Sequence, residues 1–407
     1  MLEIQYKHFE TTNKNYHTAL LSAQYASEKI KNFIASDSIP YKIFDLKNSR
    51  KQIEECKQLV KQIQNNYSHI IVIAMGGSIL NPQTLINLCN NKTSNIKIHF
   101  LCSTDPYYCQ NLLDSLPLKD CAVLAISNSG QTLETNALVG VLINAFTQHN
   151  IQDIGSRFFF ITTQNSSIMR NIADTLSATI IPHQESISGR FSGLTNVSTF
   201  IAAIAGVDVE EYITGAEQTL ERFLYNQHDN DQITAAASIV SMQKPIIVNI
   251  GYLQQFAAFL EWSSQIIAES LGKYGIGITP IHGLGPNDQH SMLQLYLDGP
   301  TDKLYSLFYI QNIDHPLGTS SLDQLNYISS KKLDSIHTAN FQATKIALET
   351  RQRPTRSIIL QDLSAKTIGA LITHSMLETI ILSYMLKVNP FDQPGVELIK
   401  VGATKLL

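Results

Sequence analysis

Cysteine is scarce in this sequence, and its distribution argues against two kinds of cross-link. The cysteines are Cys56, Cys89, Cys102, Cys109 and Cys121, all in the first third of the chain. Their number is odd, and no two of them form a Cys-x-x-Cys pair. The sequence therefore predicts neither a disulfide framework nor a zinc site.

Long basic runs and uninterrupted apolar runs are also missing. The net charge is −4, and no basic run is longer than those around Lys51 and at Lys331-Lys332, so the chain lacks the basic patch of a nucleic-acid-binding protein. Residues 1–16 are polar and lack the apolar region of a secretory signal. The most apolar stretch, 367–388, contains His374 and Glu378, which indicates a buried helix rather than a membrane span. We therefore expect a cytoplasmic enzyme without nucleic-acid or membrane partners.

Glycine is absent from residues 1–60, which have the composition of an amphipathic, helical N-terminal arm. After this arm, short apolar runs rich in β-branched residues alternate with helical stretches. The predicted strands are 69–74, 96–101, 122–126, 158–162, 179–182, 245–250, 304–310 and 357–360. Long helices are expected at 251–272 and 365–387.

This alternation of strands and helices predicts right-handed βαβ units and parallel sheets. A chain of 407 residues is long enough for two domains. We expect two doubly wound α/β domains, at 61–224 and 225–388, followed by a C-terminal tail at 389–407.

Two turns, 76–78 and 127–132, follow predicted strands and precede helices. Such turns offer backbone N–H groups and the positive end of a helix dipole to a phosphate. Hydroxyls at Ser78, Ser127, Ser129 and Thr132 add donors. Each turn alone is weak support, because glycine and serine also occur in such turns for steric reasons. Together they favour a phosphate site, and the missing Walker A lysine favours a sugar phosphate over a nucleoside triphosphate.

A few charged or polar side chains could carry chemistry, and each has an ordinary alternative. Arg190 could stabilise an oxyanion, although a lone arginine is more often a surface ion-pair partner. Gln265 and Glu269 share one helix face, where a carboxylate can act as a general base or can simply be solvated. His290 lies in a turn-rich segment, where it can shuttle protons or face water. Lys400 by itself is an ordinary lysine of the tail.

Taken together, these segments resemble the glucose-6-phosphate isomerase family in the family's order. The matching motifs are Gly76-Gly77-Ser78, residues 127–135, Ser188-Gly189-Arg190-Phe191-Ser192, Glu269-Ser270-Leu271-Gly272-Lys273, Asp288-Gln289-His290-Ser291 and residues 389–400. The last motif is very close to the bacterial form of the family. One match of this kind would be chance, but six in order are specific.

The resemblance implies two sugar-isomerase (SIS) domains with an active site between them. It implies a homodimer that shares residues across its interface. The implied reaction is the reversible isomerisation of glucose 6-phosphate and fructose 6-phosphate through a cis-enediolate, in glycolysis and gluconeogenesis. Because this chemistry is proton transfer beside a carbonyl, no metal or organic cofactor is expected.

The resemblance also implies a role for particular residues. Glu269 would move the proton between C2 and C1, and Arg190 would stabilise the enediolate. The partner subunit's His290, together with Lys400, would open the sugar ring. The implied phosphate ligands are Ser127, Ser129 and Thr132, and the implied sugar contacts are Gly77, Ser78, Gln265 and Gln393.

The sequence departs from the family pattern at several of these positions. Asn128 stands where the family carries a lysine, and Gln131 stands where it carries a threonine. The change at Asn128 removes a positive charge from the phosphate environment. Ser188, Leu271 and Asp288 also replace the usual residues. Because the catalytic residue types are retained, we expect activity with a weaker affinity for substrate.

Two other functions stay open from the sequence. One is a dual phosphoglucose/phosphomannose isomerase, which would also accept the C2 epimer. The close match over 389–400 counts against it. The other is a non-catalytic sugar-phosphate sensor built from the same domains. A sensor needs the phosphate turns but no base, so the retained glutamate, arginine, histidine and lysine count against it.

Overall fold

The structure is a computed structural model that describes residues 1–9, 14–89, 92–184, 186–226, 230–313, 315–396, 402 and 406. The chain divides into two compact units. The first unit contains Phe33–Ala216 and Phe391–Leu407, and the second contains Met1–Asn32 and Glu217–Pro390. The predicted domain boundaries, 61–224 and 225–388, stay a prediction. The compact units divide the chain at other residues.

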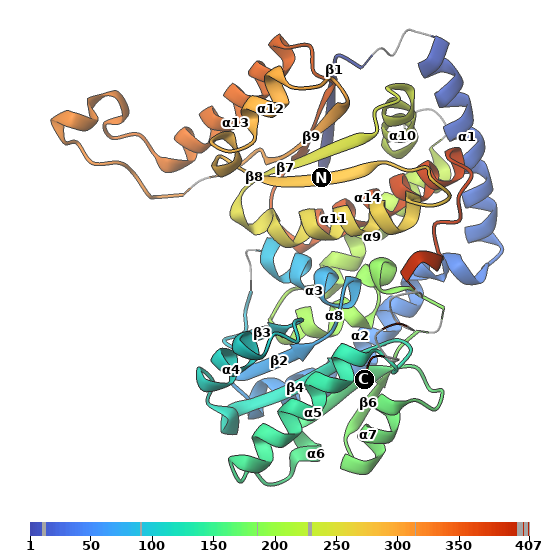
Figure 1. Ribbon diagram of the computed structural model, residues 1–407, viewed down its shortest axis with the longest axis vertical. Coiled ribbons are helices and arrows are strands. Elements are labelled where there is room, and N and C mark those ends of the chain that lie inside the picture. Colours follow the sequence, from blue (N-terminus) through green and yellow to red (C-terminus); the bar gives the residue numbers. More distant parts are fainter. Residues whose placement is uncertain are drawn as a thin grey trace. The chain divides into compact units, whose positions relative to one another are not determined.

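The sheet of the first unit is parallel, with the strand order β3-β2-β4-β5-β6 (Figure 1). Its strands are β2 (His69–Ile73), β3 (Lys97–Leu101), β4 (Cys121–Ile126), β5 (Phe158–Thr162) and β6 (Thr179–Pro182). In this register Ile71 of β2 lies opposite both His99 of β3 and Val123 of β4. Every residue of β4 and β5 is buried, as expected for parallel strands covered on both faces.

Helices cover both faces of this sheet (Figure 1). They are α2 (Leu46–Asn66), α3 (Gly77–Leu88), α4 (Pro106–Asp114), α5 (Leu133–Gln148), α6 (Ile154–Arg157), α7 (Ile168–Leu176) and α8 (Asn196–Ile204), with the 3-10 turns η1 (Ile39–Phe44), η2 (Leu118–Asp120) and η3 (Gly189–Leu194). Leu138 of α5 and Met169 of α7 share one apolar cluster with Val123. Helices α3 and α8 pack together on the other face. Helices α1 (Lys14–Ala35) and α9 (Val209–Tyr225) contain the boundaries between the units.

The sheet of the second unit repeats this plan and adds an antiparallel edge strand. Its order is β1-β10-β9-β7-β8, with β1 (Leu2–Lys7), β7 (Ile246–Tyr252), β8 (Thr279–Gly285), β9 (Lys303–Ile310) and β10 (Thr355–Leu360). Helices α10 (Asp231–Ser241), α11 (Ala257–Leu271) and α14 (Ala365–Met385) pack together, while α12 (Leu293–Asp298) and α13 (Leu333–Thr350) lie on the other face (Figure 1). Tyr296 and Phe341 join these last two helices to Val248 of β7.

Both units place their first parallel strand inside the sheet, the second on one side, and the third and fourth on the other. This order is that of a doubly wound fold, so the predicted fold class of two doubly wound α/β domains with parallel sheets is confirmed. The helical character predicted for all of residues 1–60 is wrong at the start. Leu2–Lys7 alternates apolar and polar residues, which is a strand pattern, and it pairs antiparallel with β10 as the edge strand of the sheet.

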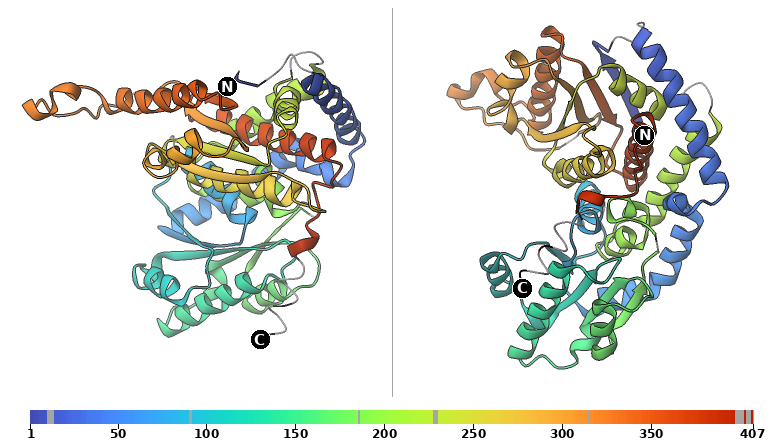
Figure 2. Two further views of the ribbon diagram at one scale, coloured as in Figure 1. Left: turned by 45° about the horizontal axis from the view of Figure 1, so that its top comes forward. Right: turned by 45° about the vertical axis from the view of Figure 1, so that its right-hand side comes forward.

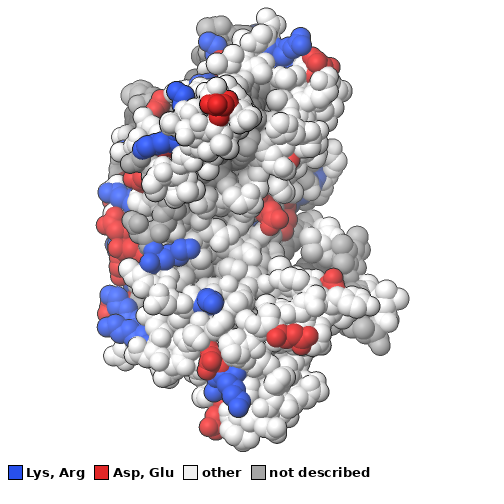
Figure 3. Space-filling model, turned by 90° about the vertical axis from the view of Figure 1, so that its left-hand side faces the viewer, with Lys and Arg blue, Asp and Glu red and all other residues white. Residues whose placement is uncertain are grey.

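Between β9 and α13 the chain forms an arm at residues 315–332, which projects from the second unit in both views of Figure 2. The arm contains the 3-10 turn η6 (Asp323–Ile328). Its two ends are joined, because Thr319 N–H donates to the Lys331 carbonyl at 2.9 Å and Gly318 bridges to Lys332. On the face shown in Figure 3, acidic and basic side chains are interspersed, so no basic patch for nucleic acid is seen there.

Helix α14 is long and apolar enough to cross a membrane, but 83% of its apolar window is buried inside the structure. The helix carries Glu378, whose carboxylate pairs with the Arg356 guanidinium of β10 through two bonds of 2.7 and 2.9 Å. Both side chains are more than nine-tenths buried. The predicted buried helix is confirmed.

Removing one partner of this pair should destabilise the protein strongly. Burial alone raises the pKa of Glu378, but Arg356 and the nearby His374, whose Nε2 lies 3.3 Å from the carboxylate, outweigh burial and hold the pKa at about 2. We expect Glu378→Gln to lower the free energy of unfolding by about 3–5 kcal/mol, because it leaves a buried, uncompensated arginine. Urea unfolding of both proteins measures this loss, and a loss below about 1 kcal/mol would contradict it.

The same pair has a defined pH dependence. The folded pKa lies below the value of about 4.3 for an unfolded glutamate. The contribution of Glu378 is therefore fully present above that pH and is lost as the pH falls toward 2. The difference in free energy of unfolding between the wild type and Glu378→Gln should therefore become smaller as the pH falls from about 4.3 toward 2.

Candidate functional site

The two predicted phosphate turns lie side by side at the carboxyl edge of the first sheet. The turn at 76–78 follows β2, and the turn at 127–132 follows β4. These strands are neighbours, and the strand order reverses between them. Ligands of doubly wound sheets bind at this reversal, outside the carboxyl ends of the strands. The fold therefore places both turns where a ligand is expected.

The serine loop, residues 127–132, is closed by its own side chains. The Ser127 and Thr132 hydroxyls lie 2.9 Å apart, and Ser127 Oγ accepts from the Gly130 N–H at 3.1 Å. Ser129 Oγ accepts from the Gln131 N–H at 3.2 Å, and Ser129 is exposed. Thr132 is the N-cap of α5, yet its side chain caps no helix N–H among the described residues. The amino end of α5 therefore keeps donors that can face an anion.

Gly130 has to be a glycine for two reasons. Its φ of +62° lies in the left-handed region that side chains rarely adopt. A Cβ there would also lie 2.2 Å from Ser167 Oγ. The loop can therefore close tightly only with glycine at this position.

Arg190 lies on the turn η3, pressed against the start of α3. A Cβ on Gly77 would lie 2.3 Å from the carbonyl carbon of Gly189 and 2.4 Å from the Arg190 nitrogen. Asn81 holds the two segments together, because its Nδ2 donates to the Gly77 carbonyl at 2.7 Å and to the Gly189 carbonyl at 2.9 Å. Ser78 is buried beside them, and Arg190 is only 1% exposed. The sequence analysis did not identify Asn81, although it lies one helical turn after Gly77.

Gly77→Ala should therefore displace the arginine turn. The added methyl group meets backbone atoms, which cannot swing aside as the end of a side chain can. We expect turnover to fall by about tenfold or more, since a shift of about 1 Å can cost up to a hundredfold. Gly140→Ala on α5 is the matched control, because no described atom would lie within 4 Å of its Cβ. Equal turnover of the two variants would contradict the packing argument.

The start of the C-terminal tail binds to Arg190. The guanidinium donates through Nη2 to the Asp392 carbonyl at 2.9 Å and through Nη1 to Gln393 Oε1. Phe391 anchors this segment, with its ring 5.4 Å from that of Phe191 and 5.2 Å from that of Tyr41. Two predicted site residues, Arg190 and Gln393, are thus neighbours. Lys400 lies outside the described residues.

Asn128, where the family carries a lysine, has a partner of its own. Its Nδ2 donates to the Ile187 carbonyl at 2.6 Å. The side chain therefore links the serine loop to the segment that leads into Arg190. From the sequence, Asn128 was interpreted only as the loss of a positive charge. Its contact with Ile187 was not predicted, because Ile187 is 59 positions away. Gln131, the other departure in the loop, is exposed.

In the second unit, Gln265 and Glu269 lie on α11 as predicted. Gln265 Nε2 donates to Glu269 Oε1 at 2.8 Å, which fixes the orientation of the half-exposed carboxylate with a neutral donor. The helix does not begin at Gly251, because β7 continues through Tyr252 and a 3-10 turn, η4 (Gln254–Phe256), intervenes. Just beyond the helix, the Lys273 ammonium donates to the carbonyl of Asn389, where the tail begins. The sequence analysis gave Lys273 no such role.

His290 is exposed, at the end of the turn η5 (Asn287–Gln289) that follows β8. Asp288 holds this turn, because its carboxylate accepts from the Leu284 N–H at 2.6 Å and from the Ser291 hydroxyl at 3.1 Å. The unusual aspartate therefore has a structural explanation. Along the chain, β8 lies between the end of α11, which carries Glu269, and His290. At about 3.3 Å per residue, this strand spans roughly 20 Å.

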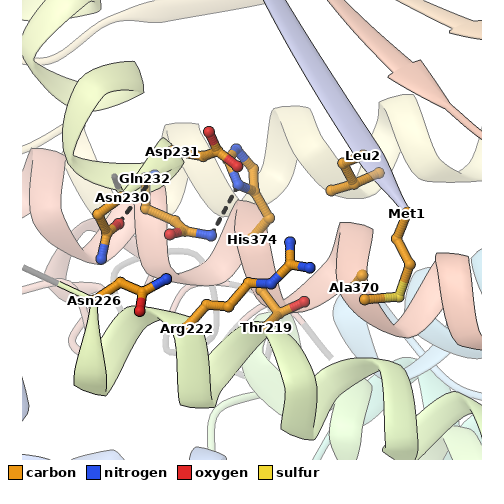
Figure 4. Close-up of a pocket in the computed structure, with 10 residues that line it drawn as sticks. All are labelled: Met1, Leu2, Thr219, Arg222, Asn226, Asn230, Asp231, Gln232, Ala370 and His374. Atoms are coloured by element: carbon orange, nitrogen blue, oxygen red, sulfur yellow. Dashed lines mark hydrogen bonds between the residues drawn. The ribbon is translucent and has the colours of Figure 1, made fainter. Parts of the chain in front are cut away.

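A pocket of about 380 Å³ lies in the second unit among α9, α10, α14 and the start of β1 (Figure 4). Gln232 and His374 line it and are joined by a hydrogen bond of 3.0 Å. None of the described residues that line this pocket is a predicted site residue. The cavity is therefore separate from the candidate catalytic residues.

Comparison with known proteins covers both units. A sequence model of the family described as phosphoglucose isomerase matches residues 44–407. A probable glucose-6-phosphate isomerase of Haloquadratum walsbyi is 31% identical over 342 residues, which cover 83% of this chain and 79% of that protein. A glucose-6-phosphate isomerase of Thermus thermophilus is 31% identical, with 83% of each chain covered. The crystal structure of a hypothetical protein, also from Thermus thermophilus, is 25% identical and matches with a TM-score of 0.90 over 99% of each chain.

Proposed function

This chain belongs to the phosphoglucose isomerase family and interconverts glucose 6-phosphate and fructose 6-phosphate, and we propose that Glu269 and Arg190 carry out the proton transfer. The observation that supports these roles best is the buried side chain of Arg190, whose backbone packs against Gly77 at the carboxyl edge of the first sheet. A buried, permanently charged group can stabilise a developing negative charge.

The reaction needs a base and a cation. The Glu269 carboxylate takes the proton from C2 of the open-chain sugar, a double bond forms between C1 and C2, and the C1 carbonyl oxygen becomes negative. Arg190 offsets this charge in the cis-enediolate. The proton of the C2 hydroxyl passes to the C1 oxygen. Glu269 then delivers its proton to C1, and the C2 oxygen becomes the carbonyl of fructose 6-phosphate. Gln265 holds the carboxylate in position through its bond of 2.8 Å.

The remaining site residues bind the substrate or open its ring in this proposal. The serine loop would hold the phosphate through Ser127, Ser129 and Thr132 and through the amino end of α5. The sugar would contact Gly77, Ser78, Gln265 and Gln393. Ring opening would use Lys400 and the partner subunit's His290.

The proposed assembly is a cytoplasmic homodimer in which each site uses one chain's Glu269 and the partner's His290. The exposure of His290 on the turn after β8 supports this arrangement, because a partner chain can reach it. The arm at 315–332 supports it as well, because Leu317, Leu322 and Tyr327 are 57%, 60% and 81% exposed. Apolar side chains exposed together on a projecting segment are typical of subunit contacts.

Complementation of two inactive variants tests the shared site. Glu269→Gln and His290→Ala chains, unfolded and refolded together, should regain activity, because a mixed dimer contains one site with both residues intact. Random pairing of equal amounts would restore about a quarter of the wild-type activity. Glu269→Gln refolded with the double variant is the matched control and should stay inactive. Proven mixed dimers without activity would mean that each site is built from one chain.

A further inference from the structure

A second pocket of the second unit lies at the edge of the sheet where ligands are not usually found. It has a volume of about 350 Å³. Its walls come from the residues just before β7, at the start of β9 and just before β10, together with His8 after β1. These are the amino ends of the parallel strands, whereas ligands of doubly wound sheets bind at the carboxyl ends. The pocket is therefore not explained by the usual binding mode of the fold.

Basic side chains dominate this pocket. Lys244, Lys303 and Arg353 line it, and none of its described lining residues is acidic. Lys303 is 5% exposed and pairs at 2.5 Å with Asp302, which is 39% exposed. Counting Asp302, the pocket has a net charge of about +2, which matches the charge of a phosphate dianion.

Arg353 has guanidinium nitrogens that lack a hydrogen-bond partner among the described residues. The residue is 5% exposed. Its Nη2 donates to the carbonyls of Leu297 and Gly299, at 2.6 and 2.9 Å, at the end of α12. Its Nε and Nη1 have no hydrogen-bond partner among the described residues. The contacts with the end of α12 therefore satisfy only Nη2. Buried donors of a charged group are costly to leave unpaired.

We propose that this pocket binds a small phosphorylated metabolite, separate from the isomerase site. The phosphate oxygens would accept from the ammonium groups of the two lysines, which are donors that proteins use for phosphate, and Arg353 would add its positive charge. The volume suits a small ligand. The pocket of Figure 4 differs, because it combines Arg222 with Asp231 and its buried histidine is already bonded to Gln232.

Titration calorimetry with inorganic phosphate tests this proposal on the full-length enzyme. The wild type should bind phosphate at two sites per chain, the isomerase site and the basic pocket. Lys244→Glu should weaken one site by about tenfold or more, because it replaces a charge-assisted contact with repulsion. Phosphate should still inhibit the isomerase competitively with an unchanged inhibition constant, since that measurement reports the isomerase site alone.

Lys345→Glu is the matched control. It makes the same change of charge at a half-buried lysine of the same unit, whose Nζ donates to Gln5 Oε1 at 2.9 Å, and it lies outside the pocket. It should keep both phosphate sites. A single phosphate site in the wild type, or equal weakening by Lys345→Glu, would overturn the proposal.

Discussion

Replacing Glu269 by glutamine should lower turnover roughly 10²–10⁴-fold, the usual contribution of general acid–base catalysis. Glutamine keeps the shape of the side chain but cannot accept the C2 proton. The hydrogen bond between positions 265 and 269 can persist, because a glutamine carbonyl also accepts from Gln265 Nε2. The loss should therefore appear in kcat, with little change in KM.

Glu261→Gln is the matched control for this variant. Glu261 lies on the same helix, α11, and is exposed to solvent. We expect its kcat to equal that of the wild type. A Glu269→Gln enzyme that keeps more than about a tenth of the wild-type kcat would show that another group is the base.

Arg190→Met should have the second largest effect, a fall in kcat of roughly 10²–10³-fold, the range seen when one group that stabilises an oxyanion is removed. Methionine fills much of the same buried space but offers no charge to the enediolate. The substrate's phosphate is held elsewhere in this proposal, so KM should change less than kcat.

Arg190 also holds the tail, and a second variant separates the two roles. Gln393→Ala removes the contact between the side-chain oxygen Oε1 of Gln393 and Arg190 but leaves the guanidinium in place. If Arg190 acts mainly through its charge, Gln393→Ala should keep most of kcat, while the loss of the proposed sugar contact raises KM. Arg190→Lys should have a higher kcat than Arg190→Met. Equal losses in Arg190→Met and Gln393→Ala would assign the arginine a positioning role instead.

The sequence predicted most of the parallel strands, because buried parallel strands are continuous runs of apolar residues. The predicted strand at 158–162 and the strand β5, Phe158–Thr162, coincide. The strand β8, Thr279–Gly285, was not predicted. It contains Pro280, Gly283 and Gly285, residues that disfavour a central strand. The structure resolves the contradiction, because β8 is an edge strand.

The candidate site was predictable as residue types but not as contacts. Glycine and serine turns and a glutamate at a helical spacing are visible in a single segment of sequence. The contacts that orient them are not, because they join distant positions. Asn81 reaches Gly189 across 108 positions, and Arg190 reaches Gln393 across 203. Such partners depend on the sheet order, which local patterns do not encode.

The most direct test of the proposed chemistry is hydrogen exchange during isomerisation in D₂O. Enzyme and fructose 6-phosphate are mixed in D₂O, and deuterium on C2 of the glucose 6-phosphate product is followed by NMR. The protonated Glu269 carboxyl can exchange with solvent before it delivers its proton, so part of the wild-type product should carry deuterium at C2. Glu269→Gln should form this product roughly 10²–10⁴ times more slowly. A wild type that forms no glucose 6-phosphate, or a Glu269→Gln enzyme that exchanges at more than about a tenth of the wild-type rate, would contradict the proposed role of Glu269.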